Sequence, residues 1–286
     1  MTKTEITEPS AATGIPSGLE GVAETLLLPL WARAEETRRP DGIIRDPMAI
    51  RILGQLDDDF QRFAKGWKSQ TGIAIRTWLI DRAVSAYLDR HPDGTVVVLG
   101  CGLDARSIRL DNGLATWIDL DLPEVIALRQ RLLPALERRH AVGCSVLDRQ
   151  WLDLVPVTAP PLMVAEGLFM YLLEADLKPL MADLATRFPG GEILIESLSL
   201  KSAGKTHQHD TVSKLNAKFV WGIDSGREIE AWHPSIKLLA EWRYLDFHRR
   251  RWRWIRHLRW ILSARPSIKL SHFRFDDRMV AGEAAA

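Results

Sequence analysis

The sequence is poor in the residues that stabilise secreted or metal-bound domains. Only two of its 286 residues are cysteines, Cys101 and Cys144, which excludes a disulfide framework and a cysteine-based zinc site. That usage fits a reducing compartment. No run approaches the roughly eighteen apolar residues of a membrane-spanning helix, and the first residues contain no apolar signal-peptide core. We therefore expect a soluble protein of the cytoplasm, with no membrane partner and no bound metal.

The chain also lacks a dominant charge and any internal repeat. Its formal net charge is +1, so no field of the whole molecule attracts nucleic acid. No similarity recurs at periods of about 20 to 50 residues. With 46% hydrophobic and 26% charged residues, the composition is that of an ordinary globular protein with a large core. We expect a monomer or homodimer that acts on a small molecule and not on nucleic acid.

After residue 95 the chain contains a regular alternation of apolar, β-branched runs and helical patterns. Such alternation predicts βαβ units and therefore an α/β fold with a parallel sheet. The residues before 95 contain only helical patterns, and two late apolar runs predict an antiparallel hairpin at the sheet edge. The predicted parts are a flexible N-terminus (1–20), an N-terminal helical cap (21–94), a Rossmann-like core (95–198), a lid insertion (199–240), and C-terminal strands with an Arg/Trp-rich helix that complete the core (241–286).

Apolar runs and turn residues also predict the individual elements. The expected strands cover 95–99, 115–120, 141–146, 161–165, 192–197, 241–247 and 268–275. The expected helices of the core cover 104–110, 123–138 and 174–188, and those of the cap cover 22–37, 60–67 and 71–90, with a further helix starting at Asp46-Pro47.

The clearest motif lies where the first expected strand ends. The buried run Thr95–Leu99 leads into Gly100-Cys101-Gly102, where two glycines allow a sharp turn and a close approach of the backbone to a ligand. About twenty residues later the next strand ends in Asp119 and Asp121, and a carboxylate at that offset accepts the hydroxyls of a ribose. The pattern predicts a site for a nucleoside-bearing cofactor, and with Ala105 it also fits a dinucleotide site.

Three further acids follow strands or turns of the same edge, and each has a structural alternative. Asp104 is placed to hold a polar part of a ligand or to cap the next helix. Asp148 is placed to reach an adenine amino group or to lie in a solvated loop. Glu166 ends a buried strand at the edge where ligands bind, and it needs a cationic partner, either an amino-acid ammonium or a structural arginine. Asp121 can also cap the following helix, and Asp119 can exchange roles with it.

Three motifs in order resemble those of the leucine carboxyl methyltransferase family, namely Val98–Arg106, Asp119–Val125 and Ala165–Leu172. Arg33–Gly42 and the neighbourhood of Trp221–Asp224 are similar to one branch of it, the bacterial O-methyltransferases of polyketide synthesis of the tetracenomycin type. The resemblance covers residues 22 to 275, approximately. It implies a class I S-adenosylmethionine-dependent methyltransferase fold, with a Rossmann-like sheet, a C-terminal antiparallel hairpin, an N-terminal helical cap and an inserted lid.

The resemblance also implies roles for individual residues around the cofactor S-adenosylmethionine. Gly100 and its turn line the methionine and ribose, and Asp121 binds the ribose hydroxyls. Asp148 lies at the adenine, Glu166 takes the methionine ammonium, and Arg76 takes the methionine carboxylate. The full predicted cofactor set is Arg33, Arg76, Gly100, Cys101, Gly102, Asp104, Asp119, Asp121, Leu122, Asp148, Arg149, Glu166 and Gly167.

Methyl transfer from a sulfonium group requires a nucleophilic oxygen in line with the methyl and the exclusion of water. A carboxylate acceptor, with a pKa of about 4, is ionised at neutral pH, whereas a phenol, with a pKa of about 10, needs a base or a cationic neighbour. The candidate bases for a hydroxyl acceptor are His207, His209 and His233 in the expected lid. Two histidines at 207 and 209 are too few for a metal site.

Aromatic residues predict the acceptor pocket, with Tyr171, Trp221 and Trp232 as walls for a flat molecule. The predicted function is an S-adenosylmethionine-dependent O-methyltransferase of secondary metabolism, acting on a carboxylate or hydroxyl of an aromatic or polyketide-like molecule. One alternative is a nicotinamide-dependent oxidoreductase, although no Tyr-x-x-x-Lys site is evident. The other is a non-enzymatic module that binds a membrane or nucleic acid through the Arg/Trp run at 249–262. The favoured reading of that run is a helix that packs tryptophan inward and arginine outward.

Overall fold

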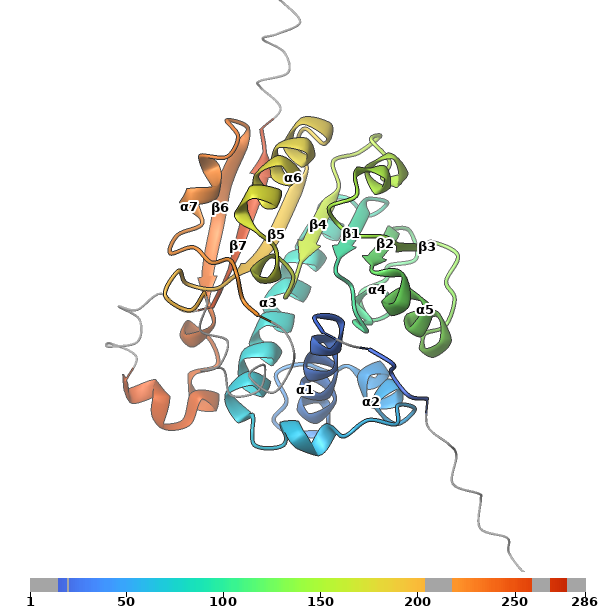
Figure 1. Cartoon of the computed structure of the whole chain (residues 1–286), viewed down its shortest axis with the longest axis vertical. Helices are drawn as coiled ribbons and strands as arrows, with labels where there is room; N and C mark the ends of the chain where they lie inside the picture. The colour runs from blue at the N-terminus through green and yellow to red at the C-terminus, as the bar shows by residue number, and fades with distance from the viewer. Residues whose placement is uncertain (1–14, 20, 204–217, 259–267, 277–286) are drawn as a thin grey trace, which may run out of the picture.

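In the described part of the chain, five helical segments precede the sheet; α1 and α2 lie below its strands in Figure 1, and α3 extends from there along one face of the sheet. The computed structural model describes residues 15–19, 21–203, 218–258 and 268–276. Helix α2 begins as the sequence predicts, because the Asp46 carboxylate accepts the Ala49 N–H at 3.1 Å and Pro47 needs no donor at the first helical position. The segments are η1 (Ala23–Leu26), α1 (Leu27–Arg38), α2 (Pro47–Leu53), η2 (Phe60–Phe63) and α3 (Trp67–Arg90).

Seven strands form one sheet in the order β3-β2-β1-β4-β5-β7-β6. The first five strands run parallel, and β7 lies antiparallel between β5 and β6. The expected parallel sheet with a late antiparallel hairpin is therefore confirmed. The strands are β1 (Thr95–Leu99), β2 (Thr116–Asp121), β3 (Arg139–Gly143), β4 (Leu162–Ala165), β5 (Glu192–Ser197), β6 (Ile236–Arg243) and β7 (Lys269–Phe275).

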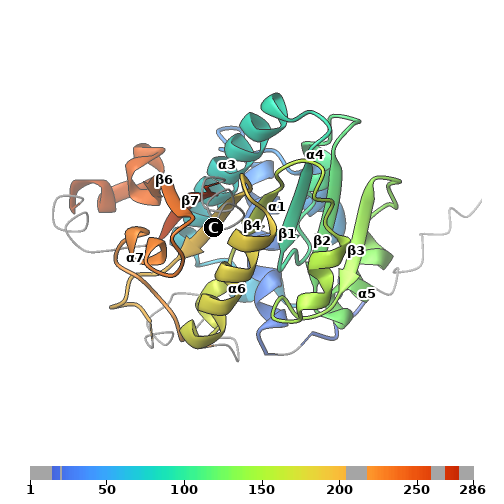
Figure 2. The ribbon, with the colours of Figure 1, turned by 90° about the horizontal axis from the view of Figure 1, so that it is seen from above.

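Both faces of the sheet are covered by helices, which Figure 2 shows with α3 and α6 on opposite sides. Because side chains alternate along a strand, Val97 and Leu99 face the α6 side, while Val96 and Val98 face α3. This double burial explains why β1 is an unbroken apolar run. The other helical segments are α4 (Arg106–Arg109), α5 (Pro123–Leu132), η3 (Arg149–Leu154), η4 (Phe169–Tyr171), α6 (Glu174–Arg187), α7 (Arg227–Glu230), η7 (Tyr244–Asp246) and η8 (Arg249–Leu258).

A third apolar cluster lies at the carboxyl ends of the central strands. There α1 and α2 pack against residues that follow β1 and against α5, including Leu103, Val125 and Leu128. Figure 1 shows α1 directly below the tips of β1 and β4. The cap thus covers the carboxyl edge of the sheet, which is the edge at which ligands bind in parallel sheets.

Three elements end several residues away from their predicted bounds, and one of them, β3, covers Arg139–Gly143 instead of 141–146. Helix α5 stops at Leu132, six residues early, because Leu133 precedes a proline and is extended, with φ −107° and ψ 141°. Strand β6 begins at Ile236 and turns into η7 at Tyr244, whereas the prediction was 241–247. Residues 236–240, predicted as the end of the lid, therefore belong to the sheet. The rest of the predicted lid stays a prediction, since 204–217 are not among the described residues.

The Arg/Trp-rich segment is not one regular α-helix. Its described part, Arg249–Leu258, is a 3₁₀ segment broken at Arg253, which has φ 49° and ψ −129°. At about three residues per turn, Trp252 and Ile255 are both buried, whereas Trp254 is 59% exposed. The prediction of inward-facing tryptophan is right for Trp252 and wrong for Trp254. None of the helices among the described residues is long and apolar enough to cross a membrane.

Candidate functional site

A cavity of about 660 Å³ lies between α1 and the carboxyl ends of β1, β2, β4 and β5, and α3 forms one of its sides. Its size is within the range of small-molecule sites. The deep end is lined by the glycine turn after β1 and by the ends of β2 and β4. The walls toward the surface are mostly apolar and come from η1, α1, α3 and the segment 244–252.

The turn after β1 requires glycine at two positions. Gly100 has φ +66° and Gly102 has φ +48°, a region that disfavours any residue with a Cβ. A Cβ on Gly100 would lie 3.1 Å from Leu168, and one on Gly102 would lie 3.2 Å from Leu26. The turn is held in place because the Gly100 and Cys101 N–H groups donate to the Leu120 carbonyl at 2.8 and 3.0 Å. Backbone is thereby exposed to the cavity at close range.

Asp121 ends β2 and presents its carboxylate at the cavity wall. One oxygen accepts the Gly102 N–H at 2.7 Å and the other accepts the Leu122 N–H at 2.8 Å. Burial raises the pKa of Asp121, against the opposing effect of these two hydrogen bonds. Each oxygen retains acceptor capacity, so this fixed carboxylate can take two further donors from a ligand.

Glu166 and Glu196 share one arginine at the deep end of the cavity. Arg76 Nε lies 2.7 Å from Glu166 Oε1, and Arg76 Nη1 lies 2.8 Å from Glu196 Oε2. Glu196 also accepts the Gly167 N–H at 2.8 Å and the Tyr244 hydroxyl at 2.9 Å. Burial raises the pKa of Glu196. For Glu166, burial is outweighed by Arg76 and Arg106, which lower its pKa.

Asp104 does not cap α4, whose N-cap is Ala105 without a side-chain bond. Instead its carboxylate pairs with Arg106 at 2.6 Å and Arg109 at 2.9 Å, with Arg33 at 4.0 Å. These three cations hold the pKa of Asp104 far below its usual value in spite of its burial.

These pairs form one buried network with an excess of negative charge. Four guanidinium groups contact five carboxylates, and a cationic ligand group placed among them would offset the difference. The network consists of Arg33, Arg76, Arg106, Arg109, Asp46, Asp81, Asp104, Glu166 and Glu196.

The structure brings eleven of the predicted residues together around the cavity. Gly167 lies there with φ +64°, Cys101 has a pKa raised by burial, and burial raises the pKa of Tyr171 to about 12. The residues that line the cavity are Arg33, Arg76, Gly100, Cys101, Gly102, Asp104, Asp121, Leu122, Glu166, Gly167 and Tyr171.

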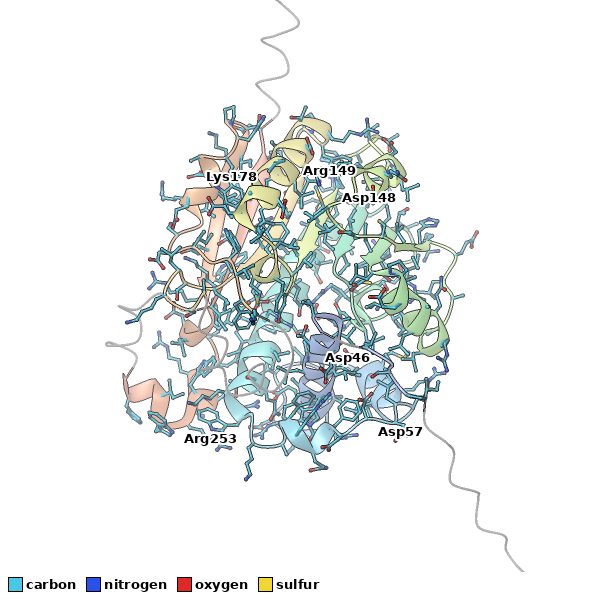
Figure 3. The ribbon with its side chains drawn as sticks, viewed as in Figure 1. Asp46, Asp57, Asp148, Arg149, Lys178 and Arg253 are labelled. Atoms are coloured by element: carbon cyan, nitrogen blue, oxygen red, sulfur yellow. The ribbon has the colours of Figure 1, made fainter. Side chains whose placement is uncertain are left out.

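Three residues of the predicted cofactor set lie elsewhere. Asp119 lies two residues before the end of β2, and its carboxylate pairs with Arg129 of α5 at 2.6 Å. Asp148 caps η3 by accepting the Gln150 N–H at 3.1 Å, and Arg149 pairs with Asp183 of α6. Figure 3 shows Asp148 and Arg149 far from Asp46 and the cap. The segment after β3 that lines the cavity is instead Cys144 to Val146.

Two predicted acceptor walls and one predicted base also lie outside the cavity lining. Trp221 is buried in the core, with its ring centroid 6.1 Å from Phe169 and 5.9 Å from Trp232, and neither tryptophan lines the cavity. His233 lies outside the lining as well, and its Nδ1 accepts the Ser235 N–H at 3.3 Å. His207 and His209 are not among the residues described.

Sequence reasoning missed several lining residues. Glu196 carried the same signal as Glu166, a carboxylate near the end of an apolar strand at the ligand-binding edge. Other lining residues reach the cavity through long-range packing that no local pattern indicates, among them Lys68, Phe219, Tyr244 and Trp252.

The class of protein follows from the sheet and the cavity. A parallel sheet of five strands, closed by an antiparallel β7 inserted beside β5, with a glycine turn and an acid at its carboxyl edge, is the class I methyltransferase fold. The chain belongs to the leucine carboxyl methyltransferase family, whose model matches residues 27–185. These findings confirm the predicted family and fold, and with them an enzyme of the class that uses S-adenosylmethionine.

Two named relatives and one solved structure are similar to this chain. The tetracenomycin polyketide synthesis O-methyltransferase TcmP of Streptomyces glaucescens is 35% identical over 80% of this chain and 85% of its own. The S-adenosyl-L-methionine-dependent methyltransferase dpfgK of Gibberella zeae is 28% identical over 77% and 81%. A solved structure from Thermobifida fusca YX has a TM-score of 0.57 at 13% identity and covers 86% of this chain and 94% of its own. That structural likeness concerns the fold alone.

Proposed function

We propose that the cavity binds S-adenosylmethionine at its deep end and that the enzyme methylates an oxygen of a small-molecule acceptor held at its outer end. The observation that carries the proposal is the meeting of three features at one sheet edge: the glycine turn, the fixed carboxylate of Asp121, and the paired acids around Arg76. We further propose that the protein works in the cytoplasm without nucleic acid, as a monomer or homodimer.

The donor set fits this cofactor part by part. The free acceptor capacity of Asp121 suits the two ribose hydroxyls. The excess carboxylate beside Glu166 suits an ammonium, and Arg76 and Arg33 suit a carboxylate. The buried Arg76 Nε has no hydrogen bond of normal geometry despite its short distance from Glu166, so this end of the network has unused polar capacity. Leu122 and the segment 144–146 would then enclose the adenine.

When bound, the cofactor supplies a sulfonium-activated methyl group. Asp121, Glu166 and Arg76 would hold the cofactor, and its sulfonium would make the methyl group electrophilic toward an ionised acceptor oxygen. The chain contributes alignment and the exclusion of water. Leu26, Ile73, Leu198 and Phe219 supply apolar walls beside the deep end.

The described lining favours an acceptor oxygen that is already ionised. Its carboxylates are bound by arginines or by backbone N–H groups, and burial raises the pKa of Tyr171 to about 12. In this proposal Asp121 holds the ribose, the other carboxylates are paired with arginines, and Tyr171 is protonated at neutral pH, so none of these groups serves as the base. A carboxylate acceptor needs none. A hydroxyl acceptor with His207 or His209 as its base stays a prediction. The kinship with TcmP supports an aromatic or polyketide-like acceptor.

Calorimetric titration with S-adenosylhomocysteine and, separately, with NAD tests the proposal. We expect binding of S-adenosylhomocysteine alone, lost in Asp121→Ala and retained in Asp148→Ala, since Asp148 lies outside the cavity lining. Binding of NAD in its place would favour the oxidoreductase alternative. Retention of full affinity by Asp121→Ala would reject the site.

A further inference from the structure

We propose that Lys68 forms a second recognition point at the outer end of the cavity, which binds an anionic group of the acceptor. The acceptor would then be an elongated, apolar molecule whose anionic group is remote from the methylated oxygen. This inference rests on the proposed function, because it assigns the remaining part of the same cavity.

Helix α3 sets the distance between the two ends of the cavity. Lys68, Gly72 and Arg76 lie four residues apart on one face of the helix, and all three line the cavity. The eight residues from Arg76 to Lys68 correspond to about 12 Å of helix rise. An acceptor with one end near the buried acids at Arg76 would therefore need a body of two or three fused or linked rings to reach Lys68.

The two ends differ in how their cations are paired. Arg76 and Arg33 are buried and already contact carboxylates. Lys68 is exposed, and it makes no ion pair within the described part of the chain. Its ammonium lies 6.0 Å from the ring centroid of Trp254, a contact that leaves the charge able to take a counter-ion. The acidic residues of the described lining, Asp104, Asp121, Glu166 and Glu196, all belong to the deep end or the ribose end.

The wall between the two ends suits an apolar body. Ile73, Leu245 and Trp252 line this stretch, and the Trp252 indole is fixed by donating to the Tyr244 and Phe247 carbonyls at 3.2 Å. Next to Lys68 in the chain, the Trp67 ring lies 4.8 Å from the Arg253 guanidinium, although neither residue lines the cavity itself. Figure 3 shows Arg253 near the lower end of α3. Residues 67–68 thus pack against residues 253–254, and Arg253 adds positive charge near Lys68.

The test uses two rigid probes on enzyme saturated with S-adenosylhomocysteine: a biphenyl with para carboxylates at both ends, and its monocarboxylate. Calorimetry would compare the wild type with Lys68→Met, Lys68→Arg and Lys65→Met. Lys65 is an exposed neighbour that does not line the cavity, so it controls for a loss of general positive charge. Binding would be measured at low and high salt, because a partly exposed ion pair is screened.

We expect the dicarboxylate to bind the wild type about 1.5- to fivefold more tightly than the monocarboxylate, which is the range for an exposed ion pair. Lys68→Met should remove this advantage, whereas Lys68→Arg and Lys65→Met should keep it. An advantage that survives Lys68→Met, or binding of neither probe, would overturn the inference. Failure of the proposed function is distinguishable, because S-adenosylhomocysteine itself would then not bind to any variant.

Discussion

The two ends of β5 carry the same ion pair in different surroundings. Arg76 pairs with Glu196 at the carboxyl end, and Arg90 pairs with Glu192 at the amino end, each at 2.8 Å and each from helix α3. The Arg76 side chain is 9% exposed and the Arg90 side chain 51%. Only the first pair faces the cavity. Because the two pairs have equal distances but unequal burial, we expect them to differ in their contribution to stability and only the buried pair to affect ligand binding.

The largest difference should appear when each arginine is removed. Arg76→Met leaves Glu196 and Glu166 without a shared buried cation, which should lower the free energy of unfolding by about 3 to 5 kcal/mol. Arg90→Met should cost about 0 to 1 kcal/mol, because its pair is exposed. Urea unfolding measures both. Similar losses in the two variants would contradict the account.

One glycine at each edge of the sheet, Gly100 at the carboxyl edge and Gly113 at the amino edge, distinguishes a loss of stability from a loss of cofactor binding. Gly100→Ala and Gly113→Ala both place a Cβ at positive φ, +66° and +81°, at a cost of about 1 to 2 kcal/mol each. Only the Cβ of Gly100 would meet another side chain, Leu168 at 3.1 Å. Calorimetry should show weaker S-adenosylhomocysteine binding in Gly100→Ala and unchanged binding in Gly113→Ala. Equal affinities in the two variants would mean that the glycine turn does not touch the cofactor.

Two buried tyrosines give a smaller version of the same contrast. Tyr244 donates to Glu196 at 2.9 Å at the carboxyl edge, and Tyr87 donates to the Pro160 carbonyl at 2.8 Å at the amino edge. Each change to phenylalanine should cost about 1 kcal/mol of stability. Tyr244→Phe alone should also weaken cofactor binding a few-fold, since Glu196 positions Arg76. If Tyr87→Phe weakens cofactor binding as much as Tyr244→Phe does, the weaker binding reflects destabilisation of the whole fold and not the contact of Tyr244 with Glu196.

The smallest expected effect is that the contributions of Glu196 and Glu192 to the free energy of unfolding change with pH in opposite directions. Burial raises the pKa of Glu196, so its contribution is present below the unfolded pKa of about 4.3 and is lost as pH rises through the folded pKa. For Glu192, His272 and Arg90 overcome burial and lower the pKa, so its contribution is present at higher pH and is lost as pH falls through the folded pKa.

Comparing the wild type with Glu196→Gln and Glu192→Gln by urea unfolding between pH 3 and 7, roughly the range over which carboxylates titrate, isolates each trend. Relative to Glu196→Gln, the wild type should lose stability as pH rises. Relative to Glu192→Gln, it should gain stability as pH rises through the acidic range. Parallel trends would show that the two carboxylates share one environment.

Local sequence signals predicted the framework of the fold and the deep end of the cavity. The strand–glycine–acid pattern located Gly100 and Asp121, and a carboxylate ending an apolar strand located Glu166. The same pattern could not distinguish Asp119 from Asp121, because only packing places Arg129 of α5 over the first.

The outer end of the cavity was less predictable. The aromatic residues near the expected lid predicted Trp221 and Trp232 as pocket walls, but both pack in the hydrophobic core. Trp252 and Lys68 line the cavity instead. The tryptophan side chain is suited both to a hydrophobic core and to the wall of a ligand pocket. Which of them faces the cavity depends on contacts between segments nearly two hundred residues apart, such as α3 and η8.

A crystal structure with bound S-adenosylhomocysteine tests the central claim most directly. The account predicts ribose hydroxyls on Asp121 and the ligand ammonium on Glu166, with the glycine turn against the ligand. A ligand bound elsewhere, or one that leaves Asp121 and Glu166 without contacts, would contradict it.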